Sequence, residues 1–117
     1  ILLRNKFLKF FQPDITKYGG ISLVHKYLNS KYRKKIFLHF LGSGVGLITS
    51  AHIMSAINSD GLLETDFNQN PLRDNIFNEK IKIINGKIYL KNKPGLGFTL
   101  SKKIIKNYTV KKFTYIS

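Results

Sequence analysis

Three side chains that can take part in acid–base chemistry stand at or near the ends of three short apolar segments. Asp14 follows the segment "LKFFQP", His39 lies in "KIFLHF" and Glu64 lies in "GLLET". Because side chains alternate along a strand, each shares a face with an apolar residue two or four positions earlier. Carboxylates and an imidazole can accept or donate protons, and catalytic residues collect where parallel barrel strands end. The three segments therefore indicate an active-site rim.

Each residue also has an ordinary structural interpretation. Asp14 follows Pro13 and could simply cap a turn. His39 could be a satisfied polar residue at the start of a loop, and Glu64 could pair with one of the many lysines. The residues taken singly leave these alternatives open.

The elements around the three residues alternate between strand and helix. A helix end is predicted over Ile1–Phe7. Strands are predicted over Leu8–Gln12, Lys35–Phe40 and Gly61–Thr65, and helices over Ile21–Asn29 and Leu47–Ile57. Such alternation with short connections favours parallel strands covered by helices, which is an α/β arrangement.

The last part of the sequence changes character. "KIKIINGKIYL" (residues 80–90) has alternating isoleucines around Asn85-Gly86, a strong hairpin signal. "KPGLGF" (residues 93–98) is predicted to be a turn, and the tail to Ser117 is basic and amphipathic.

The glycine-rich segment "LGSGVG" (residues 41–46) is predicted to be a loop before a helix. Backbone N–H groups there could hold a phosphate, but the lysine of a P-loop and the spacing of a dinucleotide fold are both absent. Of the remaining histidines, His25 is predicted to be a surface residue. His52, on an apolar helix, is predicted to be a hydrogen-bonded packing residue rather than a ligand.

The composition sets limits on the class of protein. The formal net charge is +14, but Lys, Ile, Asn, Phe and Tyr make up 57 of the 117 residues, and the lysines are scattered. Scattered lysines indicate a solvated surface rather than a nucleic-acid site. The absence of cysteine excludes disulfides and thiolate metal sites and fits a cytoplasmic protein. No apolar run is long enough for a membrane span.

Four motifs in fixed order resemble the C-terminal part of the mandelate racemase/muconate lactonizing enzyme family of the enolase superfamily. They are "QPDITKYGGIS", "HFLGSGVGLITSAHIMSAI", "GLLETDFNQNPLRD" and "NGKIYLKNKPGLGF". The resemblance implies the last three strands of a (β/α)₇β TIM-type barrel in residues 1–79. It also implies that residues 80–117 form a hairpin and tail that return to an α+β capping domain.

The resemblance also assigns roles to residues. Asp14 and His39 resemble a catalytic Asp–His pair, and Glu64 resembles the glutamate of the last barrel strand; we expect substrate contacts from Gly42, Ser43, Gly44 and Asp66. The family removes a proton α to a carboxylate, with Mg²⁺ and a Lys or His base. The implied substrate is a small-molecule carboxylate such as an acid sugar, and dehydration is the preferred outcome. Racemisation or epimerisation and lactone cycloisomerisation remain alternatives.

The Mg²⁺ ligands of the family lie on earlier strands, so we expect this chain to be a C-terminal fragment that is inactive alone, with its Mg²⁺ ligands in a missing N-terminal part. The full-length protein is expected to form a homo-oligomer and to bind neither nucleic acid nor membrane. Two rival interpretations are a small basic nucleic-acid-binding protein and a catalytically silent barrel homologue.

Overall fold

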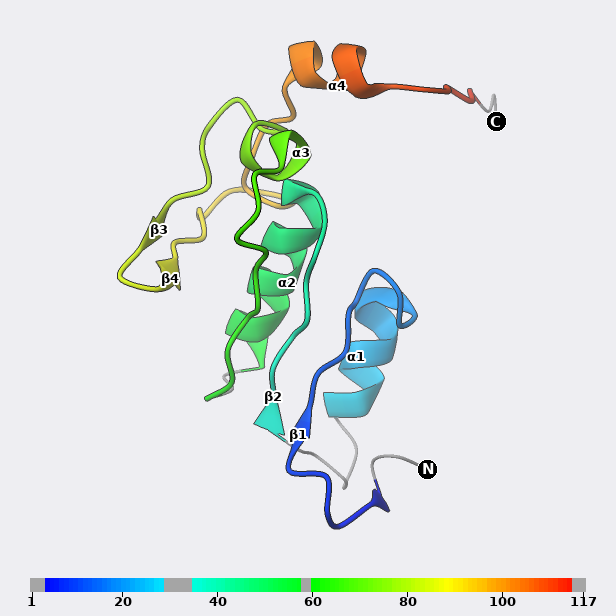
Figure 1. Cartoon of the computed structure of the whole chain (residues 1–117), viewed down its shortest axis with the longest axis vertical. Coiled ribbons are helices and arrows are strands. Elements are labelled where there is room, and N and C mark those ends of the chain that lie inside the picture. Colours follow the sequence, from blue (N-terminus) through cyan, green and yellow to red (C-terminus); the bar gives the residue numbers. More distant parts are fainter. Residues whose placement is uncertain (1–3, 29–34, 58–59, 115–117) are drawn as a thin grey trace.

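The computed structural model of this chain describes residues 4–28, 35–57 and 60–114. Figure 1 shows α2 at the centre, with α1 to its right, the β1–β2 pair below it and the β3–β4 hairpin to its left. The elements in chain order are β1 (Phe10–Phe11), α1 (Gly20–Leu28), β2 (Lys35–Ile36), α2 (Gly44–Ala56), α3 (Pro71–Asp74), β3 (Ile83–Ile84), β4 (Lys87–Ile88) and α4 (Lys102–Tyr108).

Three segments of the chain pair in parallel, as the alternation of elements predicts. β1 pairs with β2 in parallel, and the pairing continues beyond them through a hydrogen bond from the His39 N–H to the Pro13 carbonyl, at 3.1 Å. A parallel bridge joins Leu38 to Leu63, and the Glu64 N–H donates to the Leu38 carbonyl at 2.9 Å. Over the part of the chain that the structure describes, the regular strands are shorter than predicted, and the third is reduced to this bridge.

One face of this small sheet packs against the two long helices. Ile36 and Leu38 are almost completely buried in a cluster to which α1 and α2 also contribute. The buried members of this cluster are Ile15, Val24, Ile36, Leu38, Ile53 and Ile57. The opposite face carries the alternate residues. Two of them, Phe10 and Leu62, are more than half exposed.

A second apolar cluster lies on the other side of α2. Ile48 packs there with Ile76 and Phe77, and the centroids of the Phe77 and Phe98 rings lie 5.0 Å apart. Residues of the hairpin and of α4 pack against this cluster as well. Because α2 contacts both clusters, it is apolar on nearly all sides. The predicted hairpin is confirmed.

Several predicted elements need correction. Gly44 and Gly46 belong to α2 rather than to a loop, so the helix begins three residues earlier than predicted. The described residues 4–7 form a short 3₁₀ and turn segment rather than a helix end, while Ile1–Leu3 and Asn29 lie outside the described residues. The short helices α3 and α4 were not predicted.

Candidate active site

Asp14 and His39 form a hydrogen-bonded pair at the ends of adjacent strand segments. His39 Nδ1 lies 3.3 Å from Asp14 Oδ2, although 25 residues separate them in the chain. The parallel pairing explains this, since the His39 N–H bonds to the carbonyl of the residue just before Asp14. The Asp14 side chain is 7% exposed and that of His39 is 30% exposed. His39 Nε2 makes no hydrogen bond to the described residues.

A dense set of donors holds the Asp14 carboxylate ionised. Oδ1 accepts from the backbone N–H and the hydroxyl of Thr16, at 2.8 and 2.6 Å, while Lys17 Nζ lies 3.2 Å from Oδ2. Burial raises the pKa of Asp14, but the hydrogen bonds from Thr16, Lys17 and His39 outweigh it and lower the pKa to about 2. Asp14 is therefore a fixed anion beside the imidazole at neutral pH.

Glu64 lies on the third parallel segment, next to the one that carries His39. Gln12 Nε2 donates to Glu64 Oε2 at 2.8 Å across the sheet face. Both side chains are exposed in this chain. Because Gln12 precedes Asp14 by two residues, the contact places Glu64 on the same face as the Asp14–His39 pair.

The same sheet face also carries aromatic residues. The rings of Phe10 and Phe37 pack edge to face with centroids 5.0 Å apart, two residues before Gln12 and His39 respectively. Apolar side chains thus lie near the strand starts and polar, ionisable ones near the strand ends. This arrangement can orient a small polar molecule over an imidazole and a carboxyl group.

The glycine-rich segment was predicted to contact the substrate, but packing within the chain explains its glycines. A Cβ atom on Gly44 would lie 2.7 Å from the Arg73 carbonyl oxygen, and one on Gly46 would lie 2.4 Å from the Phe40 ring. The two glycines therefore allow the Arg73 carbonyl and the Phe40 ring to pack closely against the backbone of α2. Ser43 is the N-cap residue of α2, yet its hydroxyl makes no capping hydrogen bond.

A cavity of about 410 Å³ lies beside this segment. Thr16, Gly42, Ser43 and Thr49 supply polar atoms to its wall, and Ile21 and Phe40 supply apolar surface. Asp14, His39 and Glu64 are not among its lining residues. The cavity therefore adjoins the loop that holds Asp14 without containing the acid–base groups.

The structure also bears on a metal site, on the other two histidines and on a membrane span. Among the residues that the structure describes, no three His, Cys, Asp or Glu side chains gather closely enough to hold a metal ion. His52 Nε2 lies 3.2 Å from the Leu96 carbonyl oxygen, which confirms it as a packing residue, and His25 is exposed as predicted. No helix within the described ranges has the length and apolar character needed to cross a bilayer.

Comparison with known proteins decides the family. Residues 1–104 match the family described as enolase C-terminal domain-like. This chain belongs to that family. The order of its parallel segments and helices agrees with an α/β fold of the TIM-barrel type, as do its structural relatives.

Three relatives show how far the similarity extends. Arabinonate dehydratase from Saccharolobus solfataricus is 32% identical over 112 residues, which is 94% of this chain and 30% of that protein. D-galactarolactone cycloisomerase from Agrobacterium fabrum is 26% identical over 107 residues, 83% of this chain and 28% of that protein. The crystal structure of a mandelate racemase/muconate lactonizing enzyme from Bordetella bronchiseptica matches with a TM-score of 0.75 and 34% identity, covering 90% of this chain and 30% of that one.

The chain thus spans about a third of the length of these members of the enolase superfamily. The relatives are enzymes, so the resemblance to an enzyme family is confirmed. The specific reaction is a separate question, because it depends on the complete active site.

The sequence prediction missed residues that surround the acid–base groups. Thr16 and Lys17 hold Asp14, and the spacing of Asp14 and Thr16 is that of an Asx turn. Arg73 and Asn70 anchor the segment that follows Glu64. An Asn before Pro71 is a readable helix-start signal, since Asn caps helices and Pro favours their first turn.

One predicted substrate contact is already used within the chain. Asp66 Oδ1 accepts from both the backbone N–H and the side-chain amide of Asn68, each at 2.9 Å. Its carboxylate therefore stabilises the turn after Glu64.

Proposed function

We propose that this chain supplies the acid–base part of an active site that removes the proton α to the carboxylate of an acid sugar and then releases water. The observation that carries the proposal is the Asp14–His39 hydrogen bond at the ends of adjacent parallel segments, with Glu64 on the next one. Membership of the enolase C-terminal domain-like family supports it.

His39 is the group that moves the proton. Because Nδ1 faces the anionic Asp14, the proton on the neutral ring resides there, and Nε2 is left with its lone pair to accept the α-proton. The negative charge of Asp14 then stabilises the imidazolium. Asp14 is in this scheme a positioning residue, because it acts through His39.

Glu64 acts on the other end of the substrate. The C–H electron pair moves into the carboxylate of the acid sugar, where negative charge grows. A protonated Glu64 would donate a hydrogen bond to that oxygen. Gln12 occupies Oε2 and so orients the carboxyl group.

The second half of the reaction removes water. The enediolate returns its electron pair to form a carbon–carbon double bond as the β-hydroxyl leaves, and the imidazolium of His39 supplies the proton that turns this hydroxide into water. The resulting enol becomes a 2-keto-3-deoxy acid. The net change is the loss of one water, and His39 ends in its starting state.

The curated relatives favour dehydration as the first of two candidate reactions. Arabinonate dehydratase is the more similar of the two curated relatives described above, at 32% against 26% identity. A lactone cycloisomerase is the second candidate, favoured by the D-galactarolactone cycloisomerase relative. It would start from the same proton abstraction, but it would consume a lactone and release no water.

A Mg²⁺ ion, which the family relation implies, would stabilise the charge of the enediolate. The described residues offer no cluster that could hold it. We therefore assign its ligands to strands outside this chain.

The proposal requires a longer polypeptide to complete the barrel. In the described residues the parallel sheet has only three segments, whereas a barrel needs eight strands. The chain alone is expected to turn over no substrate, and measurable turnover by the isolated 117 residues would refute its role as part of a larger site.

The direct test is a screen of the complete enzyme against C5 and C6 acid sugars and their lactones, with and without a metal chelator. We expect a 2-keto acid to form from an acid sugar and to disappear when the chelator is added. Product from a lactone alone would favour cycloisomerisation. Inversion at the α-carbon without loss of water would favour racemisation or epimerisation, and no turnover of any of these compounds would contradict the proposal.

A further inference from the structure

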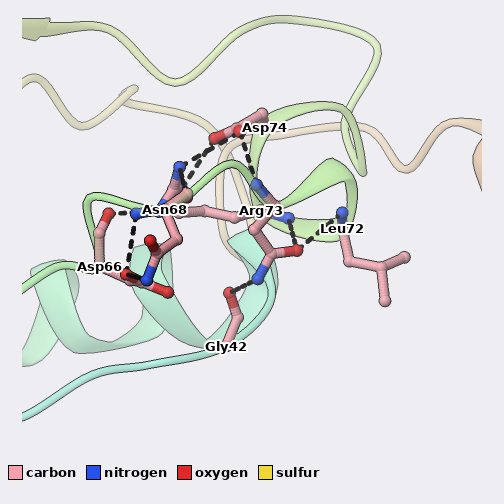
Figure 2. A network of polar contacts seen from close by, with 7 residues as sticks. Gly42, Asp66, Asn68, Leu72, Arg73 and Asp74 are labelled. Carbon is pink, nitrogen blue, oxygen red and sulfur yellow. Dashed lines mark hydrogen bonds and ion pairs between the residues drawn. The ribbon is translucent and has the colours of Figure 1, made fainter.

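The segment that follows Glu64 is held by one guanidinium group. Figure 2 shows Arg73 reaching back from α3 to this segment. Its Nη1 donates to the Asp66 carbonyl and its Nη2 donates to the Asn68 carbonyl at 2.9 Å. The side chain is only 14% exposed, and Asp74 holds it through Nε at 2.7 Å and Nη2 at 3.2 Å. The guanidinium group is thus held by the two carbonyls and by the Asp74 carboxylate.

The two carbonyls flank Phe67, which is fully exposed. The Asp66 carboxylate closes the same turn through Asn68. This turn starts two residues after Glu64, so its position limits where the glutamate can lie. An exposed loop without such contacts would be free to move.

Asn70 connects the same segment to the one that follows His39. Its Nδ2 donates to the Gly42 carbonyl at 3.2 Å, while its Oδ1 accepts from the backbone N–H groups of Leu72 and Arg73 at 3.0 and 3.2 Å. Gly42 lies three residues after His39. The Asn70 side chain therefore caps α3 and ties the two strand-end segments together.

We infer that Arg73 and Asn70 are positioning residues, which fix the distance between Glu64 and His39. Within the sheet, that distance is set by the hydrogen bond from the Glu64 N–H to the Leu38 carbonyl. Beyond the strand ends, the contacts of Arg73 and Asn70 hold together the two segments that follow Glu64 and His39. With both ends held, the carboxyl group and the imidazole can be kept in the geometry that the transition state needs. The inference rests on the proposed function, because it assigns Glu64 a role in the reaction.

The two residues can be tested by conservative variants. Arg73→Lys keeps the positive charge beside Asp74 but lacks the rigid planar fork of guanidinium N–H groups, so it does not reproduce the bonds to both carbonyls and to Asp74. Asn70→Asp keeps the oxygen that caps α3 and removes the donor to Gly42. Should Arg73→Lys fail to fold, Asn70→Asp carries the test alone. Lys91→Gln is the matched control, since it breaks the 3.0 Å Lys91–Glu79 ion pair on the hairpin side.

The measurement is a double-mutant cycle in the complete enzyme, with Glu64→Gln as the second change. We expect each positioning variant to lower kcat roughly 10- to 100-fold with wild-type Glu64, and less than about threefold in the Glu64→Gln background, with KM nearly constant. Lys91→Gln should show no coupling. Equal losses in both backgrounds, together with a lower melting temperature, would mean a purely structural role and overturn the inference.

Failure of the proposed function would look different. Normal turnover by a His39→Asn variant would remove the proposed chemistry itself. If His39→Asn is inactive and Glu64→Gln is impaired, but Arg73 and Asn70 show no coupling to Glu64, only the positioning role is refuted.

Discussion

His39 Nδ1 lies 3.3 Å from Asp14 Oδ2, and the backbone pairing of the sheet is what brings them together. The hydrogen bond from the His39 N–H to the Pro13 carbonyl fixes the register one residue before Asp14. The side-chain contact is therefore a consequence of strand order rather than of a flexible loop. Moving the register by one residue would send the imidazole to the opposite face.

Turnover should depend on the anion that orients His39. In an Asp14→Asn variant the carboxylate that holds the ring proton on Nδ1 and fixes the imidazole is lost. We expect kcat to fall about 10- to 100-fold, with KM changed much less. Measuring kcat and KM in the complete enzyme checks this.

Lys17→Gln is the control for that experiment. Lys17 also contacts Asp14 Oδ2, but its side chain is 66% exposed, so its contribution is screened by solvent. It should lower kcat much less than Asp14→Asn. A normal kcat in Asp14→Asn would separate Asp14 from the proton transfer.

Asp14 should also make the protein sensitive to acid. Its pKa is lowered from 3.8 to about 2, so the folded state prefers the ionised form. The resulting stabilisation, about 2 kcal/mol, is fully present above about pH 4 and is lost as the pH falls toward about 2. The difference in unfolding free energy between wild type and Asp14→Asn should therefore shrink as the pH falls from about 4 to about 2.

Thr16→Val offers a matched check on the acid sensitivity. It removes the hydroxyl that donates to Asp14 at 2.6 Å and keeps the shape of the side chain. The carboxyl group should then titrate at higher pH, so that stability begins to fall earlier on acidification. A difference between wild type and Asp14→Asn that stays constant with pH would show that the carboxylate does not stabilise the fold.

Gly46→Ala should destabilise the protein even though alanine favours helices. The new Cβ would lie 2.4 Å from the Phe40 ring, and that ring is almost completely buried and has little room to move. We expect a loss of about 1–3 kcal/mol by chemical denaturation. Ser55→Ala, at an exposed position in the same helix, should change the unfolding free energy by less than about 0.5 kcal/mol. A neutral or stabilising Gly46→Ala would contradict the packing explanation.

Much of the site could be predicted because alternation along strands depends on few assumptions. The shared face of Gln12 and Asp14, and that of Phe37 and His39, follows from a period of two, and it holds although the regular strands are only two residues long. Strand length was overestimated because strand geometry persists only where a neighbour pairs. Within the described residues the third segment pairs at a single bridge.

The rest depends on contacts that leave no local pattern. Gly44 and Gly46 looked like a ligand loop, but the reason for them is the Arg73 carbonyl and the Phe40 ring, which only the folded chain brings near. Arg73 bonds to backbone carbonyls, which any residue supplies, so its role has no sequence signature. The Asn70-Pro71 start of α3, in contrast, could have been predicted from capping rules.

The most direct test of the account is the turnover of a His39→Asn variant in the complete enzyme, compared with His25→Asn on the exposed side of α1. We predict that His39→Asn lowers kcat, and the exchange of the substrate α-proton with solvent, about 10²–10⁴-fold, with substrate binding changed less than about threefold. His25→Asn should behave like wild type. Near-normal turnover and α-proton exchange in His39→Asn would contradict the claim that this imidazole moves the proton.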